Sequence, residues 1–176
     1  LINLEDMLKN GTVINGKKID TPKSFQVACT VTTQIIAQVA SSQYGGQSIN
    51  GVDRILAPYV RISFEKHKKV IEEEFKEIYG LDVDPEAIDG VQTIQYQINT
   101  LMTTNGQSPF VTLFMYFKPD YEYAKEAAMI DEEIMEQRIT GIKNEQNVYV
   151  TPAFPKLIYV LDEHNVYPDS PYYYLT

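Results

Sequence analysis

The sequence predicts an α/β fold in which helices cover a parallel sheet, and two observations support this prediction. Two continuous apolar segments, 110–117 and 153–161, are typical of strands that are buried on both faces. Each of them follows a segment with helical periodicity, and such alternation is the element order of α/β proteins. Because so few strands are present, we expect the sheet to be completed by chain outside residues 1–176.

The first twenty residues alternate short apolar stretches with turn residues. Asn10-Gly11 and Asn15-Gly16 are strong turn pairs, because Asn and Gly both tolerate positive φ. We therefore expect 12–14 and 17–19 to be the arms of a small hairpin.

A long helix is expected over about 22–44. Thr21 is a suitable N-cap and Pro22 a suitable first helical residue, where its missing N–H costs nothing. Apolar side chains then recur at three- and four-residue steps until Gly45-Gly46 ends the pattern. The other side of this helix is small and uncharged, which favours packing against a neighbouring subunit.

A second long helix is expected over about 51–79. Asn50 is its predicted N-cap, and Asp53 in the first turn would complement the helix dipole. Residues 66–69, Lys-His-Lys-Lys, form the one cationic cluster of an acidic chain. Two interpretations stay open: ion pairs with glutamates on a solvated face, or a triphosphate site.

Two further helices precede the apolar strands. The first is expected from Asp84-Pro85 to about 102, with Gly90 as a weak point, and 105–109 interrupts the pattern after it. The second is expected over 121–139 and is followed by a polar stretch. The side chains expected to point inward from this second helix are Ala127, Ile130, Ile134 and Ile139.

Composition bounds the class of protein. The formal net charge of −9 argues against a general nucleic-acid binder, whose affinity rests on many Lys and Arg contacts to phosphate. No apolar run approaches the roughly 20 residues that cross a bilayer, and no signal peptide is visible. The single Cys29 excludes an internal disulfide and fits a reducing cytoplasm. Both ends are apolar, as expected of a piece of a longer chain.

Few residues offer chemistry of their own. His67 and His164 have no His or Cys companions, so we expect no metal site. Cys29 lies mid-helix without a nearby cation to lower its pKa, and we expect a buried structural cysteine. The loop from Asn105 to Phe110 lies before a buried strand, where it would either hold a polar ligand or serve as a connector.

The exact residues of several segments are more specific for a protein family than their hydrophobic patterns are. The sequence resembles the anaerobic (class III) ribonucleoside-triphosphate reductases, large catalytic subunit, over nearly its whole length and in the family's order. The segments that carry this resemblance are Thr33–Ser41 with Tyr44-Gly45-Gly46, Asn50–Asp53 with Leu56-Ala57-Pro58, Asn99-Thr100-Leu101, Asn105–Thr112 and Phe154-Pro155-Lys156-Leu157.

The resemblance implies a fold and a reaction. Residues 1–176 would be a single partial domain, a helix-dominated piece of the ten-stranded α/β barrel of ribonucleotide reductases and glycyl-radical enzymes. The family reduces ribonucleoside triphosphates through a glycyl radical and a cysteine thiyl, with formate as the expected reductant. An activase that uses an iron-sulfur cluster and S-adenosylmethionine installs the radical. The catalytic cysteines and the radical glycine lie outside this chain, which would be inactive alone and hold no catalytic residue or cofactor.

The resemblance also implies partners and a site. The two long helices would form a homodimer, and a dNTP or ATP effector would bind at their junction. Gln34 would contact the base and Lys66 a phosphate, with Lys68 and Lys69 as alternatives. The loop residues Asn105, Gly106, Gln107 and Ser108 would line the substrate side, facing a ribonucleoside triphosphate. We expect a cytoplasmic protein without nucleic-acid or membrane partners.

Two other assignments differ in class. A stand-alone nucleotide-sensing or assembly module would use the same helices without catalysis. Another glycyl-radical enzyme, such as a formate-lyase, would share the barrel but not these helix segments.

Overall fold

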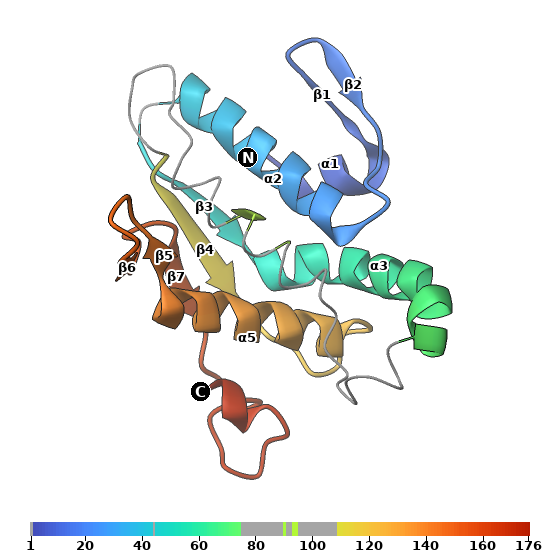
Figure 1. Cartoon of the computed structure of the whole chain (residues 1–176), viewed down its shortest axis with the longest axis vertical. Helices are drawn as coiled ribbons and strands as arrows, with labels where there is room; N and C mark the ends of the chain where they lie inside the picture. Colours follow the sequence, from blue (N-terminus) through green and yellow to red (C-terminus); the bar gives the residue numbers. More distant parts are fainter. Residues whose placement is uncertain (1, 44, 75–89, 91–92, 95–108) are drawn as a thin grey trace.

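A three-stranded parallel sheet lies at the centre of the fold (Figure 1). The computed structural model describes residues 2–43, 45–74, 90, 93–94 and 109–176, without the side chains of 67–74. The sheet has the order β3 (Gln47–Asn50), β4 (Val111–Met115) and β7 (Lys156–Tyr159). Both pairings are parallel, with Gln47 opposite Val111 and Thr112 opposite Lys156. The predicted parallel α/β arrangement is confirmed.

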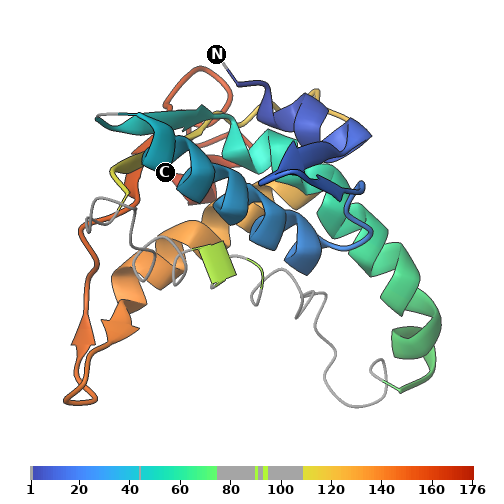
Figure 2. The ribbon, with the colours of Figure 1, turned by 90° about the horizontal axis from the view of Figure 1, so that it is seen from above.

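Within the described residues three long helices pack along the sheet, and the central one is α3 (Val52–Glu74). Figure 1 and Figure 2 show α3 between α2 (Phe25–Ser42) and α5 (Ala124–Thr140). It packs against both of them. The short α1 (Leu4–Asn10) packs against α2, and the predicted hairpin, β1 (Thr12–Ile14) with β2 (Lys17–Ile19), is confirmed to the residue.

The start of α2 differs from its prediction. The helix begins at Phe25, and its N-cap is Ser24, whose side chain accepts a hydrogen bond from the Val27 N–H. Thr21 instead donates its hydroxyl to the Lys9 carbonyl at the end of α1. Thr21 and Pro22 as cap and first residue were therefore wrong, because a second capping residue lies three positions later.

The start of α3 also differs, because Asn50 ends a strand instead of capping the helix. Gly51 follows with φ +65°, and its carbonyl accepts the first helical hydrogen bond, from Ile55. The sequence Gln-Ser-Ile-Asn of β3 contains one apolar residue, so its pattern does not resemble a buried strand. Its place is set by backbone pairing with β4.

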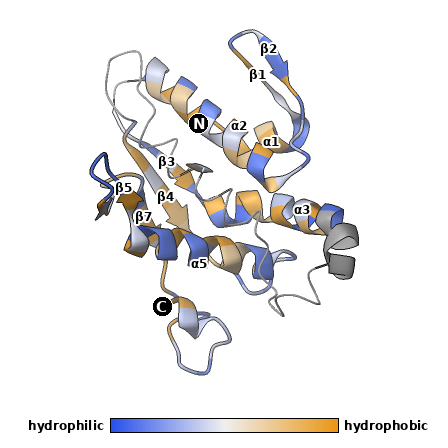
Figure 3. Cartoon of the chain, in the orientation of Figure 1, coloured by the Kyte–Doolittle hydropathy of each residue, from blue (hydrophilic) through white to orange (hydrophobic). Residues whose placement is uncertain are grey.

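The two apolar segments form strands that differ in how deeply their side chains are buried. The pairing residues of β4 alternate between fully and partly buried side chains, and Figure 3 shows the hydrophobic residues along it. In β7, by contrast, Lys156 and Ile158 are exposed. The expected burial on both faces is therefore wrong for β7, whereas β4 is fully buried on one face and partly buried on the other.

Helix α5 confirms three of its four predicted inward residues. Ala127, Ile130 and Ile134 are buried, whereas Ile139, in the last turn of the helix, is 83% exposed. The polar stretch after it contains a short antiparallel pair, β5 (Ile142–Lys143) with β6 (Tyr149–Val150). The chain closes on the 3-10 turn η1 (Tyr173–Leu175).

Most of the helix predicted over 84–102 lies outside the described residues. Gly90, Thr93 and Ile94 are helical and lie against the start of α2, where Thr93 accepts a hydrogen bond from the Gln26 side chain. The predicted loop residues 105–108 lie outside the described residues altogether.

Candidate functional site

The pairing of α2 with α3 positions the two residues predicted to bind an effector. The Phe25 N–H at the start of α2 donates to the Ser63 hydroxyl on α3, at 2.7 Å. Further along α2, Ile35 lines the same cavity as Ile55 from the first turn of α3. The two helices therefore run in opposite directions along each other.

Both predicted effector residues are exposed, and they lie toward opposite ends of this helix pair. Gln34 is on the solvent side of α2, and Lys66 is on the solvent side of α3. Counted from the Phe25–Ser63 contact, nine residues on α2 and three on α3 separate them by roughly 18 Å along the axes, at 1.5 Å per residue. One chain therefore does not bring the two side chains together. The side chains of His67, Lys68 and Lys69 lie outside the described residues.

The exposed side of α2 is uncharged. Val27, Gln34, Gln38 and Ser41 follow one another at helical spacing along it, and Val27 is 48% exposed. On α3, Ile62 and Phe64 are 39% and 46% exposed. An apolar and amide surface of this kind suits contact with another protein surface better than contact with water.

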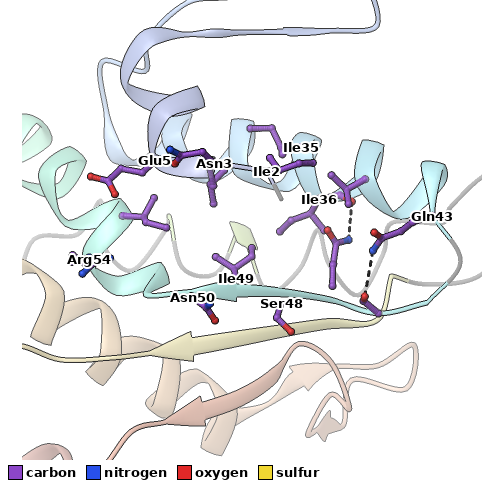
Figure 4. A pocket seen from close by; sticks show the side chains of 15 residues that line it. Ile2, Asn3, Glu5, Ile35, Ile36, Gln43, Ser48, Ile49, Asn50 and Arg54 are labelled. Atoms are coloured by element: carbon purple, nitrogen blue, oxygen red, sulfur yellow. Dashed lines mark hydrogen bonds between the residues drawn. The ribbon is translucent and has the colours of Figure 1, made fainter.

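A cavity of about 470 Å³ lies on the opposite side of α2, along the outer edge of β3 (Figure 4). Isoleucines from α2, β3 and α3 form much of its wall. The Gln47 side chain donates to the Ile36 carbonyl at 2.9 Å and ties β3 to α2. Glu5 and Arg54 provide its charged groups. Gln34 and Lys66 do not line it, so it is separate from the predicted effector residues.

The predicted substrate-side loop, Asn105 to Ser108, lies outside the described residues, but the residues that follow it are described. Phe110 enters β4, and its carbonyl accepts a hydrogen bond from the Gln47 N–H at 2.9 Å. Its ring meets that of Phe154 edge to face, with centroids 4.9 Å apart. Phe110 therefore lies at the amino-terminal edge of the sheet, close to where α2 passes into β3.

The sequence analysis missed the polar groups buried at the opposite, carboxyl-terminal edge of the sheet. Asp53, predicted to complement the dipole of the second long helix, is fully buried and accepts a hydrogen bond from the Tyr116 N–H just after β4. Asp131 of α5 is also fully buried. For Asp53, the one feature of the sequence that singled it out was its place in a first helical turn. For Asp131, burial could have been predicted from its spacing of four residues from Ala127 on the inward face of the helix.

Cys29 and His164 lie in different surroundings. Cys29 is fully buried, as expected. His164 is exposed, and its Nε2 lies 4.0 Å from Glu163 Oε1. Among the residues that the structure describes, no group of three or more His, Cys, Asp or Glu side chains is arranged to bind a metal. Of the described helices, none has the length and apolarity needed to cross a bilayer.

A parallel sheet with helices packed along it places the chain in the α/β class of proteins. Comparison with known proteins is more specific, because the sequence model of a family described as anaerobic ribonucleoside-triphosphate reductase matches residues 1–176. The chain belongs to this family.

Curated relatives agree with this assignment. The chain is 40% identical to the anaerobic ribonucleoside-triphosphate reductase of Haemophilus influenzae, over 92% of this chain and 22% of that protein. It is 36% identical to that of Enterobacteria phage T4, over 98% of this chain and 28% of the relative. The Escherichia coli protein of the same name is 39% identical, over 92% of this chain. The chain thus spans 22% to 28% of the length of the relatives it matches.

Proposed function

We propose that this chain is part of an enzyme that reduces ribonucleoside triphosphates to deoxyribonucleoside triphosphates under anaerobic conditions. The observation that carries the proposal is the family match over all 176 residues. In the whole protein the chemistry would use a glycyl radical and a cysteine thiyl, with formate as reductant. An activase with an iron-sulfur cluster and S-adenosylmethionine would install the radical, in the cytoplasm. The buried Cys29 takes no part in this chemistry.

Within that enzyme, β3, β4 and β7 would be consecutive strands of the ten-stranded barrel. Their parallel pairing supports this proposal. So does the outer edge of β3, which borders a cavity of about 470 Å³ where a further strand from the rest of the protein would lie. The loop Asn105 to Ser108 would line the substrate side of the barrel.

The segment would also supply the dimer interface through α2 and α3. The support is the uncharged exposed stripe of α2, together with the exposed Ile62 and Phe64 of α3. Burying such side chains against a second copy removes apolar surface from water without desolvating a charge.

A dNTP effector would then bind between two chains. Because Gln34 and Lys66 lie toward opposite ends of the helix pair, a two-fold arrangement is the simpler way to bring one base contact and one phosphate contact together. Gln34 of one chain would bind the base, and the partner's Lys66 would bind the phosphates. An ammonium group bound to a phosphate is a charge-assisted contact, and such contacts are among the strong ones.

Binding of dNTPs to the full-length protein tests this site. Lys66→Gln should weaken binding of the preferred dNTP by roughly 10- to 100-fold, the equivalent of about 1.5–3 kcal/mol for a bond to a charged group. Lys125→Gln, at an exposed cation on α5, is the matched control and should leave affinity unchanged. Gln34→Ala should change discrimination among bases, with Gln38→Ala, one turn along, as its control. Equal affinities for Lys66→Gln and the parent protein would refute this assignment.

A further inference from the structure

Asn-Gly pairs recur along the chain, and their surroundings in the fold differ. The described residues contain Asn10-Gly11, Asn15-Gly16 and Asn50-Gly51, while Asn105-Gly106 lies outside them. In such a pair the main-chain nitrogen of glycine is poorly shielded, because glycine has no side chain. Once it has lost its proton, this nitrogen can attack the neighbouring asparagine amide, provided that neither group is held elsewhere. The fold therefore decides which asparagine reacts.

The pair Asn15-Gly16 forms the turn of the hairpin between β1 and β2, which stands beside α2 (Figure 1). The φ angles are +51° for Asn15 and +75° for Gly16, typical of the two-residue turn in which Asn-Gly is favoured. Both residues are exposed. Among the described residues, neither the Asn15 side chain nor the Gly16 N–H has a hydrogen-bond partner. The attacking nitrogen and the amide that it would attack are thus both free.

The pair Asn50-Gly51 has the same local sequence, because an isoleucine precedes the asparagine in both cases. Its surroundings are different. Asn50 is paired with Phe114 across the sheet, and the buried Gly51 donates its N–H to the Phe114 carbonyl at 2.9 Å. Attack by the Gly51 nitrogen would require this bond to break, so the sheet protects Asn50.

The pair Asn10-Gly11 is also held in place. The Asn10 side chain donates to Asp6 Oδ1 at 2.8 Å. A Cβ added to Gly11 would lie 2.7 Å from the Ile19 carbonyl oxygen, so the main chain there is closely packed. Both the amide and the main chain beside it are therefore restrained.

Attack also requires the main chain at Asn15 to rotate out of its turn conformation. The arms of the hairpin are three residues long, and the pair next to the turn is Ile14 with Lys17. Opening the turn disturbs this last pair first, and the ends of short exposed elements open at a small cost in free energy. The fold therefore restrains Asn15 much less than it restrains Asn50.

We propose that Asn15 is a site of spontaneous deamidation, with the Gly16 nitrogen as nucleophile and water as co-reactant. The Gly16 nitrogen gives up its proton and forms a bond to Asn15 Cγ, while the Cγ–Nδ2 bond breaks and the amide leaves as ammonia. Water then opens the resulting five-membered succinimide ring at one of its two carbonyl carbons. The products are aspartate and isoaspartate. One water molecule is consumed for each ammonia released, and nothing is oxidised or reduced.

The products change the hairpin. Each adds a carboxylate next to the exposed Lys17 and Lys18. Isoaspartate also adds one carbon to the main chain, in a turn whose length fixes the register of the two arms. Val13 of β1 lines a groove together with Gln38 of α2, so a change of register alters the surface beside the exposed stripe of α2. Because ammonia is lost, the change accumulates with the age of the protein.

Peptide mapping by mass spectrometry tests the site in the full-length protein during incubation at mildly alkaline pH. In the folded protein we expect Asn15 to be converted severalfold faster than Asn10 and Asn50. In denaturant the three rates should become similar, because only the fold distinguishes the pairs. The rate at Asn15 should rise in proportion to hydroxide, since the attacking nitrogen is deprotonated. Equal rates at Asn15 and Asn50 in the folded protein would overturn the proposal, and so would a difference that persists in denaturant.

Asn15→Gly provides a matched variant, because Gly-Gly also suits this turn and has no amide to lose. Hydrogen exchange at the amides of residues 12–19 should become faster as the parent protein ages, and should stay constant in the variant. Equal changes in both proteins would overturn the assignment of this ageing to Asn15.

Discussion

The Ser63 hydroxyl, in the middle of α3, accepts a 2.7 Å hydrogen bond from the Phe25 N–H, the first residue of α2. The first N–H groups of a helix have no hydrogen-bond acceptor within that helix. Here α3 provides an acceptor for one of them. Both residues are fully buried. This bond fixes how far α2 is offset along α3, and with it the positions of Gln34 and Lys66.

Replacing Ser63 with Ala should destabilise the protein. The Phe25 N–H would stay buried without an acceptor, at a cost of about 1–3 kcal/mol. Chemical denaturation should show a lower midpoint with an unchanged slope. Ser42→Ala is the control, because the Ser42 hydroxyl donates to a carbonyl of its own helix at an exposed position. Equal midpoints for the two variants would show that the Ser63 bond contributes little.

Gly90 should not tolerate alanine, although a glycine within a helix usually gains from that change by about 1 kcal/mol. An added Cβ would overlap the buried Phe25 ring and lie 3.2 Å from the Cys29 sulfur. Overpacking of this kind costs about 1–3 kcal/mol. Gly46→Ala is the control, since its Cβ would find its nearest neighbours at 3.4 and 3.5 Å. Melting temperatures compare the two, and a more stable Gly90→Ala would mean that helix propensity dominates.

This glycine shows what sequence periodicity predicts and what it omits. The alternation of helices with apolar strands predicted the parallel sheet, because burial leaves its mark on the residues of β4. Strand β3 has no such apolar pattern. One apolar residue in four is enough there, because backbone hydrogen bonds to β4 hold the strand in place. The contact of Gly90 with Phe25, like the hydrogen bond from the Tyr116 N–H to Asp53, joins residues distant in sequence. A single sequence without its fold does not reveal such pairs.

Arg138 should be difficult to replace with Lys. Its guanidinium donates to the Pro152 carbonyl at 2.6 Å and also to the Pro155 carbonyl, holding the segment that leads into β7. Lysine carries one ammonium group and lacks the planar fork, so at least one buried carbonyl loses a charged donor. We expect Arg138→Lys to lower stability by about 1–3 kcal/mol in chemical denaturation. The exposed Arg54→Lys should have a much smaller effect, and similar losses would exclude a special role for the fork.

Mixed dimers should reveal whether the proposed effector site spans two chains. A Gln34→Ala chain and a Lys66→Gln chain each weaken both sites of their own homodimer. In a mixed dimer with sites shared across the interface, one site carries both substitutions and the other carries neither. Calorimetric titration of tagged mixed dimers should therefore find half of the sites with the parent affinity.

A site built within one chain gives a different titration. Every site of the mixed dimer then carries one substitution, and none regains the parent affinity. The separation of roughly 18 Å along the helix axes favours the shared arrangement, because nine residues of α2 and three of α3 lie between the two side chains and their common contact. Ser63→Ala in both chains adds a geometric control. It loosens the offset between α2 and α3, so it should weaken every site in proportion, whichever arrangement is present.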